Sequence, residues 1–519
     1  MPFFITPTQA AALVKDNFSV GVSGFGGWLG ADLIFAEMRE RFLASGSPAG
    51  LSIYGGILPG DLSENDCGMN FFAQPGMVSS VTAAHVGMAP KFGRCILKNA
   101  FPAFALPLGL FSNLLSAAAG KKPGVLTKVG LETFVDPRVE GGALNEAALQ
   151  SGKNVCSVNT IKGEEYLFYP TFRLDACLLR VSLADKNGNL STKCDPMTAE
   201  QLEMAMAVKA QGGLVIAQAD NLVDELMPKE ILIHSSSVDY IVHDVEHYCA
   251  PGYICPVYRP EICGQARTEA KEAAVSELNI RKICGRRGAF ELQAGDVVNL
   301  GIGIPDTVAV VAAEEGFSSE ILLSVESGPL GGVPVGGVAF GASENPDVIY
   351  RIADNFNFYD GGGLNIAFLG AGEIDERGNV NVSKFGVKTT GPGGFINIVQ
   401  NTPVVCFMCT FTAGGLKAAT LDGKLCILQE GRERKFRKSV QQITFSGDFA
   451  KKSGQKILYI TERAVFELKN KGLELVEIAP GVDLEKDIIA QMDFVPHISP
   501  ELKQMDKRIF EKGLMHIQI

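Results

Sequence analysis

Glu326 is the residue whose sequence context most strongly suggests chemistry. It ends an apolar run, Ile321 to Val325, and a loop containing Gly328, Gly331 and Gly332 follows it. A carboxylate at the carboxyl end of a strand lies where open α/β sheets bind their ligands. Glycines beside it let a ligand approach the backbone and leave N–H groups free to bind a developing negative charge. This context favours a catalytic carboxylate over the simpler interpretation, an exposed loop glutamate.

Other familiar catalytic motifs are imperfect or missing. The segment Gly21 to Phe25 carries Ser23 but does not match the G-x-S-x-G elbow of serine hydrolases. The segment Gly24 to Gly30 spaces its last glycine one residue too far for a dinucleotide-binding turn, and no P-loop pattern occurs. Serine hydrolysis, NAD chemistry and ATP chemistry are therefore not supported.

Two groups of residues contain potential metal ligands, and neither predicts a metal or redox site. The first is dense in ligand types but lacks the spacing of a standard zinc module; it comprises His243, His247, Cys249, Cys255 and Cys263. The second is Cys406 and Cys409, in an apolar strand whose alternation points the two thiols to opposite faces. A zinc site in the first group stays a minor alternative.

Glu326 lies within one copy of a degenerate internal repeat. Three pairs of segments align in the same order: 16–24 with 296–304, 51–60 with 323–332, and 174–189 with 364–379. The offset falls from 280 to 190, so the first half carries 90 additional residues. Within the second pair, Tyr54 aligns with Glu326. The repeat predicts two related halves, of which only the second has the carboxylate.

The repeat also predicts the fold class. Each half opens with an apolar strand, a glycine-rich turn and a helix, near 30–43 in the first half and after Pro305 in the second. Strands that alternate with helices indicate two open α/β domains, 1–270 and 286–519, joined by a charge-rich linker at 271–285. The Asp-x-x-Gly-Asn segments at 185–189 and 375–379 are typical of β-turns.

Composition limits the partners and the compartment. The 519 residues carry a formal charge of −11, which argues against a nucleic-acid binder. An anionic ligand would have to be held by backbone N–H groups and a few individual Lys or Arg residues. The longest uncharged run, 99–120, is broken by Pro102 and Pro107, so a membrane span is not expected. The N-terminus has no signal-peptide pattern, and the cysteines are sparse and irregular. A cytoplasmic protein is expected.

Several motifs together resemble family I coenzyme A transferases, over nearly the whole chain. The segment from Ser324 to Gly337 resembles the active-site segment of that family, and further matches occur at 133–138, 165–169, 358–363, 378–386 and 391–397. The subgroup that these motifs resemble is the single-chain acetate and propionate (short-chain acyl) CoA-transferases. The resemblance implies a fold like that of the sugar-phosphate isomerases and a reaction without ATP or metal.

The resemblance also implies roles for particular residues. Glu326 would attack the acyl-CoA thioester, and a glutamyl-CoA thioester would then carry CoA to a second acid such as acetate in a ping-pong cycle. The backbone N–H groups of Ile302 and Gly394 would form the oxyanion hole. The CoA-binding residues would be Gly301, Ile302, Gly303, Gly393, Gly394 and Lys384. The carboxylate pocket would be lined by Gly24, Phe25, Gly26, Gly27 and Leu108. A homo-oligomer, such as a tetramer, is expected.

One position departs from the family pattern and two other functions stay open. Leu108 stands where the family usually has a glutamine, and because leucine cannot donate a hydrogen bond, a more apolar acyl pocket is expected. An acyl-CoA hydrolase on the same fold would use water in place of the second acid. A non-catalytic ligand-binding regulator is the remaining alternative, although it would not need Glu326.

Overall fold

The computed structural model describes residues 2–243, 258–269, 274–386 and 388–519. The chain forms two compact units. The first comprises Met1–Thr268, Val325–Asn357 and Val387–Asn397, and the second comprises Glu269–Ser324, Phe358–Gly386 and Ile398–Ile519. Two segments of the second half, which carry Glu326 and Gly394, thus pack with the first half. The units do not follow the two sequence halves in this respect.

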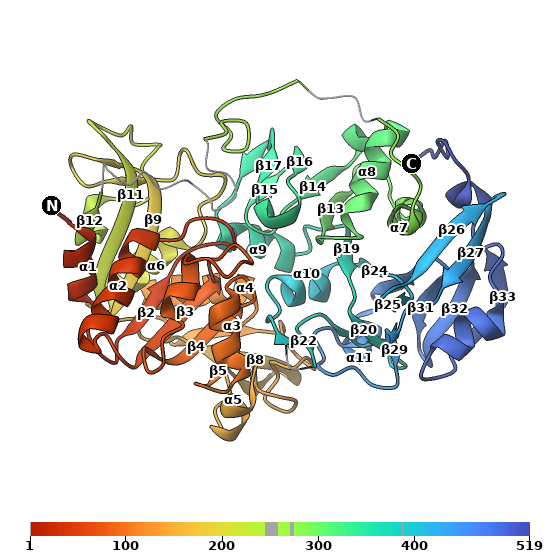
Figure 1. The fold of residues 1–519 in the computed structure, drawn as a ribbon, viewed down its shortest axis with the longest axis horizontal. Coiled ribbons are helices and arrows are strands. Elements are labelled where there is room, and N and C mark those ends of the chain that lie inside the picture. The colour runs from red at the N-terminus through yellow and green to blue at the C-terminus, as the bar shows by residue number, and fades with distance from the viewer. Residues whose placement is uncertain (1, 244–257, 270–273, 387) are drawn as a thin grey trace. The chain divides into compact units, whose positions relative to one another are not determined.

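The first unit is built on a sheet that is parallel apart from one short strand (Figure 1). Its order is β1 (Phe3–Ile5), β12 (Tyr240–Val242), β11 (Leu214–Val223), β9 (Ala176–Asp185), β2 (Ser19–Val22), β3 (Leu51–Ile57), β4 (Val78–His85) and β5 (Ala103–Ala105), with β10 (Leu190–Ser191) antiparallel to β9. Its main helices are α1 (Pro7–Leu13), α2 (Asp32–Ser45), α3 (Pro90–Leu97), α4 (Leu108–Ala119) and α6 (Gln201–Ala210). Buried strands of this kind are typical of sheets covered by helices.

The second unit contains a sheet of mixed direction. Parallel pairing joins β14 (Leu322–Ser324), β13 (Val297–Leu300), β19 (Ile366–Gly370), β24 (Val404–Met408) and β30 (Lys456–Ile460). The sheet continues through the antiparallel strands β31 (Ala464–Lys469) and β32 (Gly472–Ile478) and ends at β33 (His497–Gln504). The helices include α7 (Ile280–Ala289), α8 (Asp306–Glu315) and α11 (Gly447–Ser453), while α9 (Ile352–Asp360) and α10 (Phe395–Asn401) cross the unit boundaries.

Strand pairing confirms the internal repeat. Ser19 pairs with Ser52, and the aligned residues Asn299 and Ser324 pair in the same way. The pairing of β9 with β11 recurs between β19 and β24 at the same aligned residues. Between the two pairs the register differs by two residues, since Val20 faces Ala176 but Val298 faces Ile366. The two halves therefore share one strand order.

The two predicted turns are confirmed and nearly identical. Asp185 Oδ1 accepts hydrogen bonds from the backbone N–H groups of residues 187 and 189, and the Asn189 amide binds Oδ2. Asp375 accepts the same three bonds in the second unit, with Asn379 in the place of Asn189. Each turn is thus held by its own aspartate, which makes these residues structural.

The predicted helix starts are present, but the predicted linker is partly helical. The helix predicted near 30–43 is α2, and Pro305 directly precedes α8 as predicted. Within 271–285, α7 begins at Ile280. Its Lys282 is buried and forms an ion pair with Glu314, which offsets the loss of hydration. From residue 280 onward, this polar stretch is therefore helical, and its Lys282 is buried in an ion pair and not exposed to solvent.

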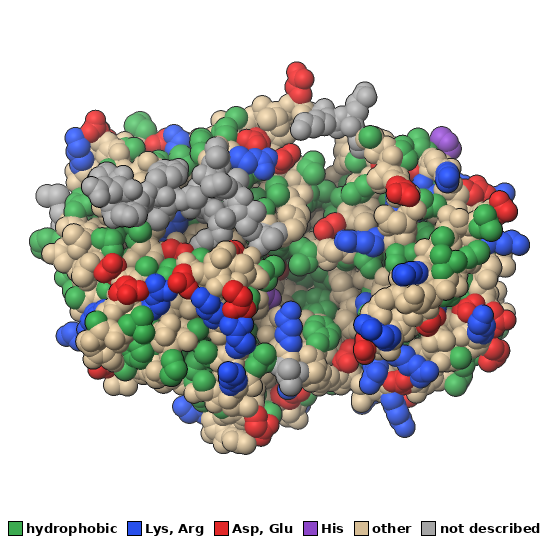
Figure 2. Space-filling model, viewed as in Figure 1, with side chains coloured by type: hydrophobic (Ala, Val, Ile, Leu, Met, Phe, Trp, Pro, Cys, Tyr) green, Lys and Arg blue, Asp and Glu red, His purple; other side chains and the backbone are tan. Residues whose placement is uncertain are grey.

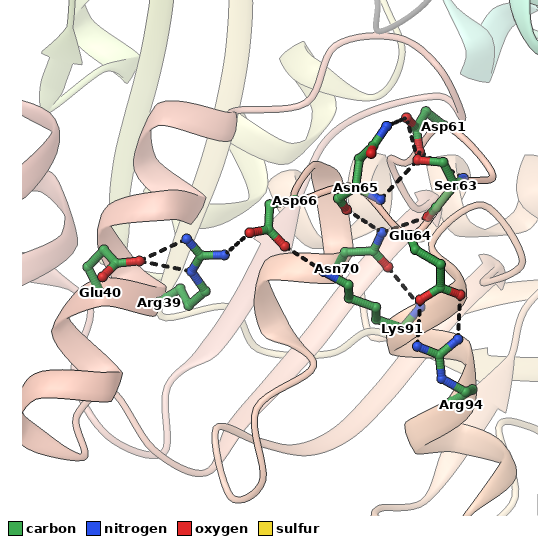
Figure 3. A network of polar contacts seen from close by, with 10 residues as sticks. All are labelled: Arg39, Glu40, Asp61, Ser63, Glu64, Asn65, Asp66, Asn70, Lys91 and Arg94. Carbon is green, nitrogen blue, oxygen red and sulfur yellow. Dashed lines mark hydrogen bonds and ion pairs between the residues drawn. The ribbon is translucent and has the colours of Figure 1, made fainter.

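An ion-pair network holds the connection between β3 and β4 in the first unit (Figure 3). Asp66 binds Arg39 of α2 at 2.7 Å and Lys91 of α3 at 2.6 Å. Glu64 binds Arg94 one turn further along α3. The network fixes the start of α3, which follows the carboxyl end of β4.

On the face shown in Figure 2, acidic and basic side chains are interspersed, and no large basic patch gathers there. Among the described residues, no helix is both long enough and apolar enough to cross a membrane.

Candidate active site

The backbone around Glu326 is fixed by several hydrogen bonds. The Gly328 N–H bonds the Val325 carbonyl at 3.0 Å and so closes a tight turn. The buried amide of Asn355 donates from Nδ2 to the carbonyls of Val325 and Glu326, at 3.1 and 3.2 Å. A Cβ on Gly328 would lie 2.1 Å from the Tyr350 carbonyl oxygen, so no larger residue fits there. Glu326, which is partly exposed as a residue, therefore projects its side chain from a rigid turn.

Gly394 lies directly against the Glu326 carboxylate. Its N–H donates a hydrogen bond to that carboxylate. A Cβ on Gly394 would lie 1.9 Å from Glu326 Oε2 and 2.7 Å from Phe356 Cζ, so only glycine fits. Gly394 thus places a backbone N–H donor beside the carboxylate that the sequence predicts to be catalytic.

The start of α4 and the end of β4 hold the loop that carries Gly394. The Gly393 N–H bonds the Ala84 carbonyl at 2.9 Å, and the Leu108 N–H bonds the Gly393 carbonyl at 3.0 Å. The Gly109 N–H donates to Asn397 Oδ1 at 3.1 Å. Because both sides of the loop are anchored, the Gly394 N–H keeps its direction.

Enclosure by protein raises the pKa of Glu326 to about 7, and the hydrogen bond from Gly394 opposes that rise. The protonated acid cannot act as a nucleophile. We therefore expect kcat/KM for an acyl-CoA to fall about tenfold per pH unit well below this pKa. A profile that is flat between about pH 5 and about pH 8 would contradict this assignment.

The same pKa predicts a change in stability. The folded pKa lies above the ordinary value of 4.5, so the folded chain binds more protons between the two values, and stability falls as pH rises through that window. Glu326→Gln removes the titration. The melting temperature of the variant relative to the wild type should rise from about pH 5 to about pH 8.

The predicted loop from Gly24 to Gly27 packs against the segment that follows Glu326. Phe25 is buried, and a Cβ on Gly341 would lie 2.9 Å from its ring. Trp28 donates from Nε1 to the carbonyls of Ala339 and Phe340, at 3.3 and 3.2 Å. The loop and the Glu326 segment thus form one packed region of the first unit.

Leu108 is completely buried, and a buried acid lies close to it. A Cβ on Gly56 would be 2.9 Å from Leu108 Cδ1 and 2.2 Å from Glu200 Oε1. Glu200 Oε2 has no hydrogen-bond partner among the described residues, and burial raises the pKa of this carboxyl to about 8. The leucine therefore packs beside an acid that holds its proton at neutral pH.

The other predicted CoA-binding residues belong to the second unit. The Ile302 side chain is 58% exposed. The Gly303 N–H bonds Asp306 Oδ2 at 2.9 Å, and the Gly301 N–H bonds the Phe368 carbonyl at 2.8 Å. Lys384 is partly exposed, and its backbone N–H bonds Asn381 Oδ1. The roles predicted for these residues stay predictions.

The potential metal ligands that the structure describes contact backbone carbonyls or are buried thiols. His243 Nδ1 lies 3.1 Å from the Ala219 carbonyl, and Cys263 bonds the Cys194 carbonyl. Cys406 and Cys409 are buried free thiols whose pKa values burial raises. No cluster of three potential metal ligands occurs among residues that the structure describes. His247, Cys249 and Cys255 lie outside these residues.

Sequence reasoning missed three residues near the site: His85, Glu200 and Asn355. Glu200 and Asn355 lie in helical regions rich in other polar residues, and no spacing distinguishes them. His85 did carry a signal, because it closes the alternating run of β4 and a glycine follows two residues later. Such a position is a strand end, where open sheets bind ligands.

The fold and this site define a two-unit α/β protein with a carboxylate nucleophile candidate beside a backbone N–H donor. A family model described as "Coenzyme A transferase" matches residues 4–244. The caffeate CoA-transferase of Acetobacterium woodii is 41% identical over 99% of this chain and 98% of its own length. The acetate CoA-transferase YdiF of Escherichia coli K12 is 39% identical over 98% of this chain and 96% of its own length.

Solved structures agree with the sequence relatives. The apoenzyme of the acyl-CoA transferase YdiF from E. coli O157:H7 matches with a TM-score of 0.93 and 37% identity, over 100% of this chain and 98% of that one. A thioester complex of the same enzyme with CoA matches with the same TM-score at 36% identity, over the same shares. The chain belongs to the coenzyme A transferase family, and it is a CoA-transferase. The predicted family and fold class are confirmed.

Proposed function

We propose that the enzyme exchanges CoA between a short-chain acyl-CoA and a free acid such as acetate, with Glu326 as the nucleophile. The observation that carries this proposal is the Glu326 carboxylate, held on a rigid turn, enclosed by protein and hydrogen-bonded to the Gly394 N–H. The relatives named for acetate and caffeate transfer support the reaction type. Their names specify different acids, so relatedness alone leaves the acid open.

The reaction divides into two displacements on carbonyl carbon. A Glu326 carboxylate oxygen attacks the thioester carbonyl and the C–S bond breaks. CoA leaves as the thiolate, and an acyl-glutamyl anhydride is formed. The thiolate then attacks the glutamyl carbonyl, the C–O bond breaks, and the first acid leaves as its carboxylate. A second carboxylate reverses these steps on the glutamyl-CoA thioester. No net proton is consumed, and the thioester free energy is retained.

The hydrogen bond from Gly394 suits the second displacement. When the thiolate adds to the glutamyl carbonyl, negative charge develops on an oxygen of Glu326 itself. The Gly394 N–H already points at this carboxylate, so it needs no reorganisation to stabilise the charge. Ile302 stays the second proposed donor, and Gly301, Gly303 and Lys384 stay proposed CoA contacts.

Transfer and hydrolysis are separated by one assay. We expect loss of acetyl-CoA to depend on an added acceptor such as propionate and to yield the new acyl-CoA in equal amount. A rate that is unchanged without an acceptor, with free CoA as product, would instead indicate a hydrolase.

Leu108 is proposed to set the preference for the acid. Leu108→Gln places an amide beside Glu200, whose Oε2 is unbonded in the part of the chain that the structure describes. We expect the ratio of kcat/KM for acetate over butyrate to rise about tenfold, because a less apolar pocket gains less from butyrate's additional methylenes, each worth about 1–3 kcal/mol in an apolar pocket. An unchanged ratio would show that Leu108 does not face the acyl group.

A further inference from the structure

His85 lies at the carboxyl end of β4, beside the loop that carries Gly394. The Val86 N–H bonds the Thr390 carbonyl at 2.8 Å, and the Gly393 N–H bonds the Ala84 carbonyl at 2.9 Å. The residues on both sides of His85 therefore hold this loop. His85 is partly exposed as a residue and lies at a strand end of the kind where open α/β sheets bind ligands.

The hydrogen bonding of His85 fixes which ring nitrogen carries the proton. Nδ1 accepts a hydrogen bond from the Gly87 N–H at 3.3 Å. A neutral ring that accepts at Nδ1 must carry its proton on Nε2. No residue in the described part of the chain bonds Nε2. The ring thus presents a neutral N–H donor that no described residue accepts.

The charge of Lys388 contributes to the electrostatic surroundings of this donor. Burial, together with the Lys388 ammonium, lowers the pKa of His85 to about 4, so the ring stays neutral at physiological pH. Lys388 itself is exposed, six residues before Gly394. A neutral N–H donor beside an ammonium matches a ligand that is rich in oxygen and negatively charged.

We propose that His85 is a CoA-binding residue, whose Nε2–H donates to an oxygen of the CoA moiety while Lys388 supplies positive charge to the same ligand. This inference rests on the proposed function of Glu326. A small acid has only the carboxylate that reacts at Glu326. CoA adds amide carbonyls and phosphates that reach beyond the reacting carbon, and a second donor along the Gly394 loop suits these groups.

Two conservative variants separate binding from a structural role. In His85→Asn, the side-chain oxygen stands in for Nδ1 and keeps the bond from Gly87, but the outward donor is lost. In His85→Gln, the amide nitrogen reaches the place of Nε2 and restores that donor. We expect His85→Asn to raise KM for acetyl-CoA about tenfold, with KM for the acceptor acid unchanged, and His85→Gln to stay within about twofold of the wild type.

Binding without turnover keeps this test independent of the proposed nucleophile. Calorimetry with free CoA compares Glu326→Gln with Glu326→Gln/His85→Asn, and the second protein should bind about tenfold more weakly. His234→Ala is the matched control, because His234 is exposed and, among the described residues, its ring bonds only Ser236. Equal CoA affinity in the two Glu326→Gln proteins would overturn the proposal. So would a larger KM for acetyl-CoA in His85→Gln than in His85→Asn, which would assign His85 to holding Gly87.

Discussion

Glu326→Gln is expected to abolish CoA exchange, with kcat reduced by at least about 10⁴-fold. The amide keeps the shape of the side chain and can still accept the hydrogen bond from Gly394, but it cannot attack a thioester. The loss is large because every turnover passes through this one carboxylate. Initial rates with acetyl-CoA and propionate measure it.

The control for this variant lies six residues upstream. Glu320 is exposed, and Glu320→Gln makes the same chemical change on the same chain. It should retain wild-type rates and the wild-type melting temperature. If Glu326→Gln exchanged CoA at a rate near that of Glu320→Gln, the nucleophile would be a different group.

Gly394→Ala is the second substitution with a large expected effect. Its added methyl group would lie 1.9 Å from Glu326 Oε2, a separation that real contacts do not allow. The carboxylate or the loop must move, and Phe356, 2.7 Å away on the same side, limits how the loop can move. A displacement of about 1 Å at a reacting group costs about 10²-fold, so we expect kcat to fall by about that factor.

The measurement combines kinetics with stability. Gly93→Ala is the matched control, since a Cβ at Gly93, in α3, meets no atom within 4 Å. If Gly394→Ala lowered the melting temperature and kcat together, the pH profile would separate the causes. A displaced Glu326 loses the bond from Gly394 that opposes its raised pKa, so the profile should shift to higher pH. An active variant with the wild-type profile would refute the contact.

Much of this architecture follows from local sequence signals. The aligned glycines, aspartates and apolar runs predicted the repeat, because each half needs the same strand, turn and helix. Asp185 and Asp375 show why, since each organises its turn through its own neighbours in the chain. Glu326 could be selected because it breaks the repeat, standing where the first half has Tyr54.

The remainder depends on contacts between residues that are distant in sequence. Asn355 holds the backbone of Glu326 from 29 residues away, and Leu108 holds Gly393 from the other half of the chain. No spacing rule connects such partners. The segments 325–357 and 387–397 belong to the first unit for the same reason. They come from the second half of the chain but pack with residues of the first half. The cytoplasmic location and the homo-oligomer stay predictions.

The central claim is that CoA becomes covalently attached to Glu326. It is tested most directly by mixing the protein with acetyl-CoA without an acceptor acid, reducing the product with borohydride and analysing the peptides by mass spectrometry. A glutamyl-CoA thioester is reduced to an alcohol, so we expect a modified residue 326 in the wild type and an unmodified peptide in Glu326→Gln. A modification at any other residue, or an unmodified Glu326 in protein that exchanges CoA rapidly, would contradict the account.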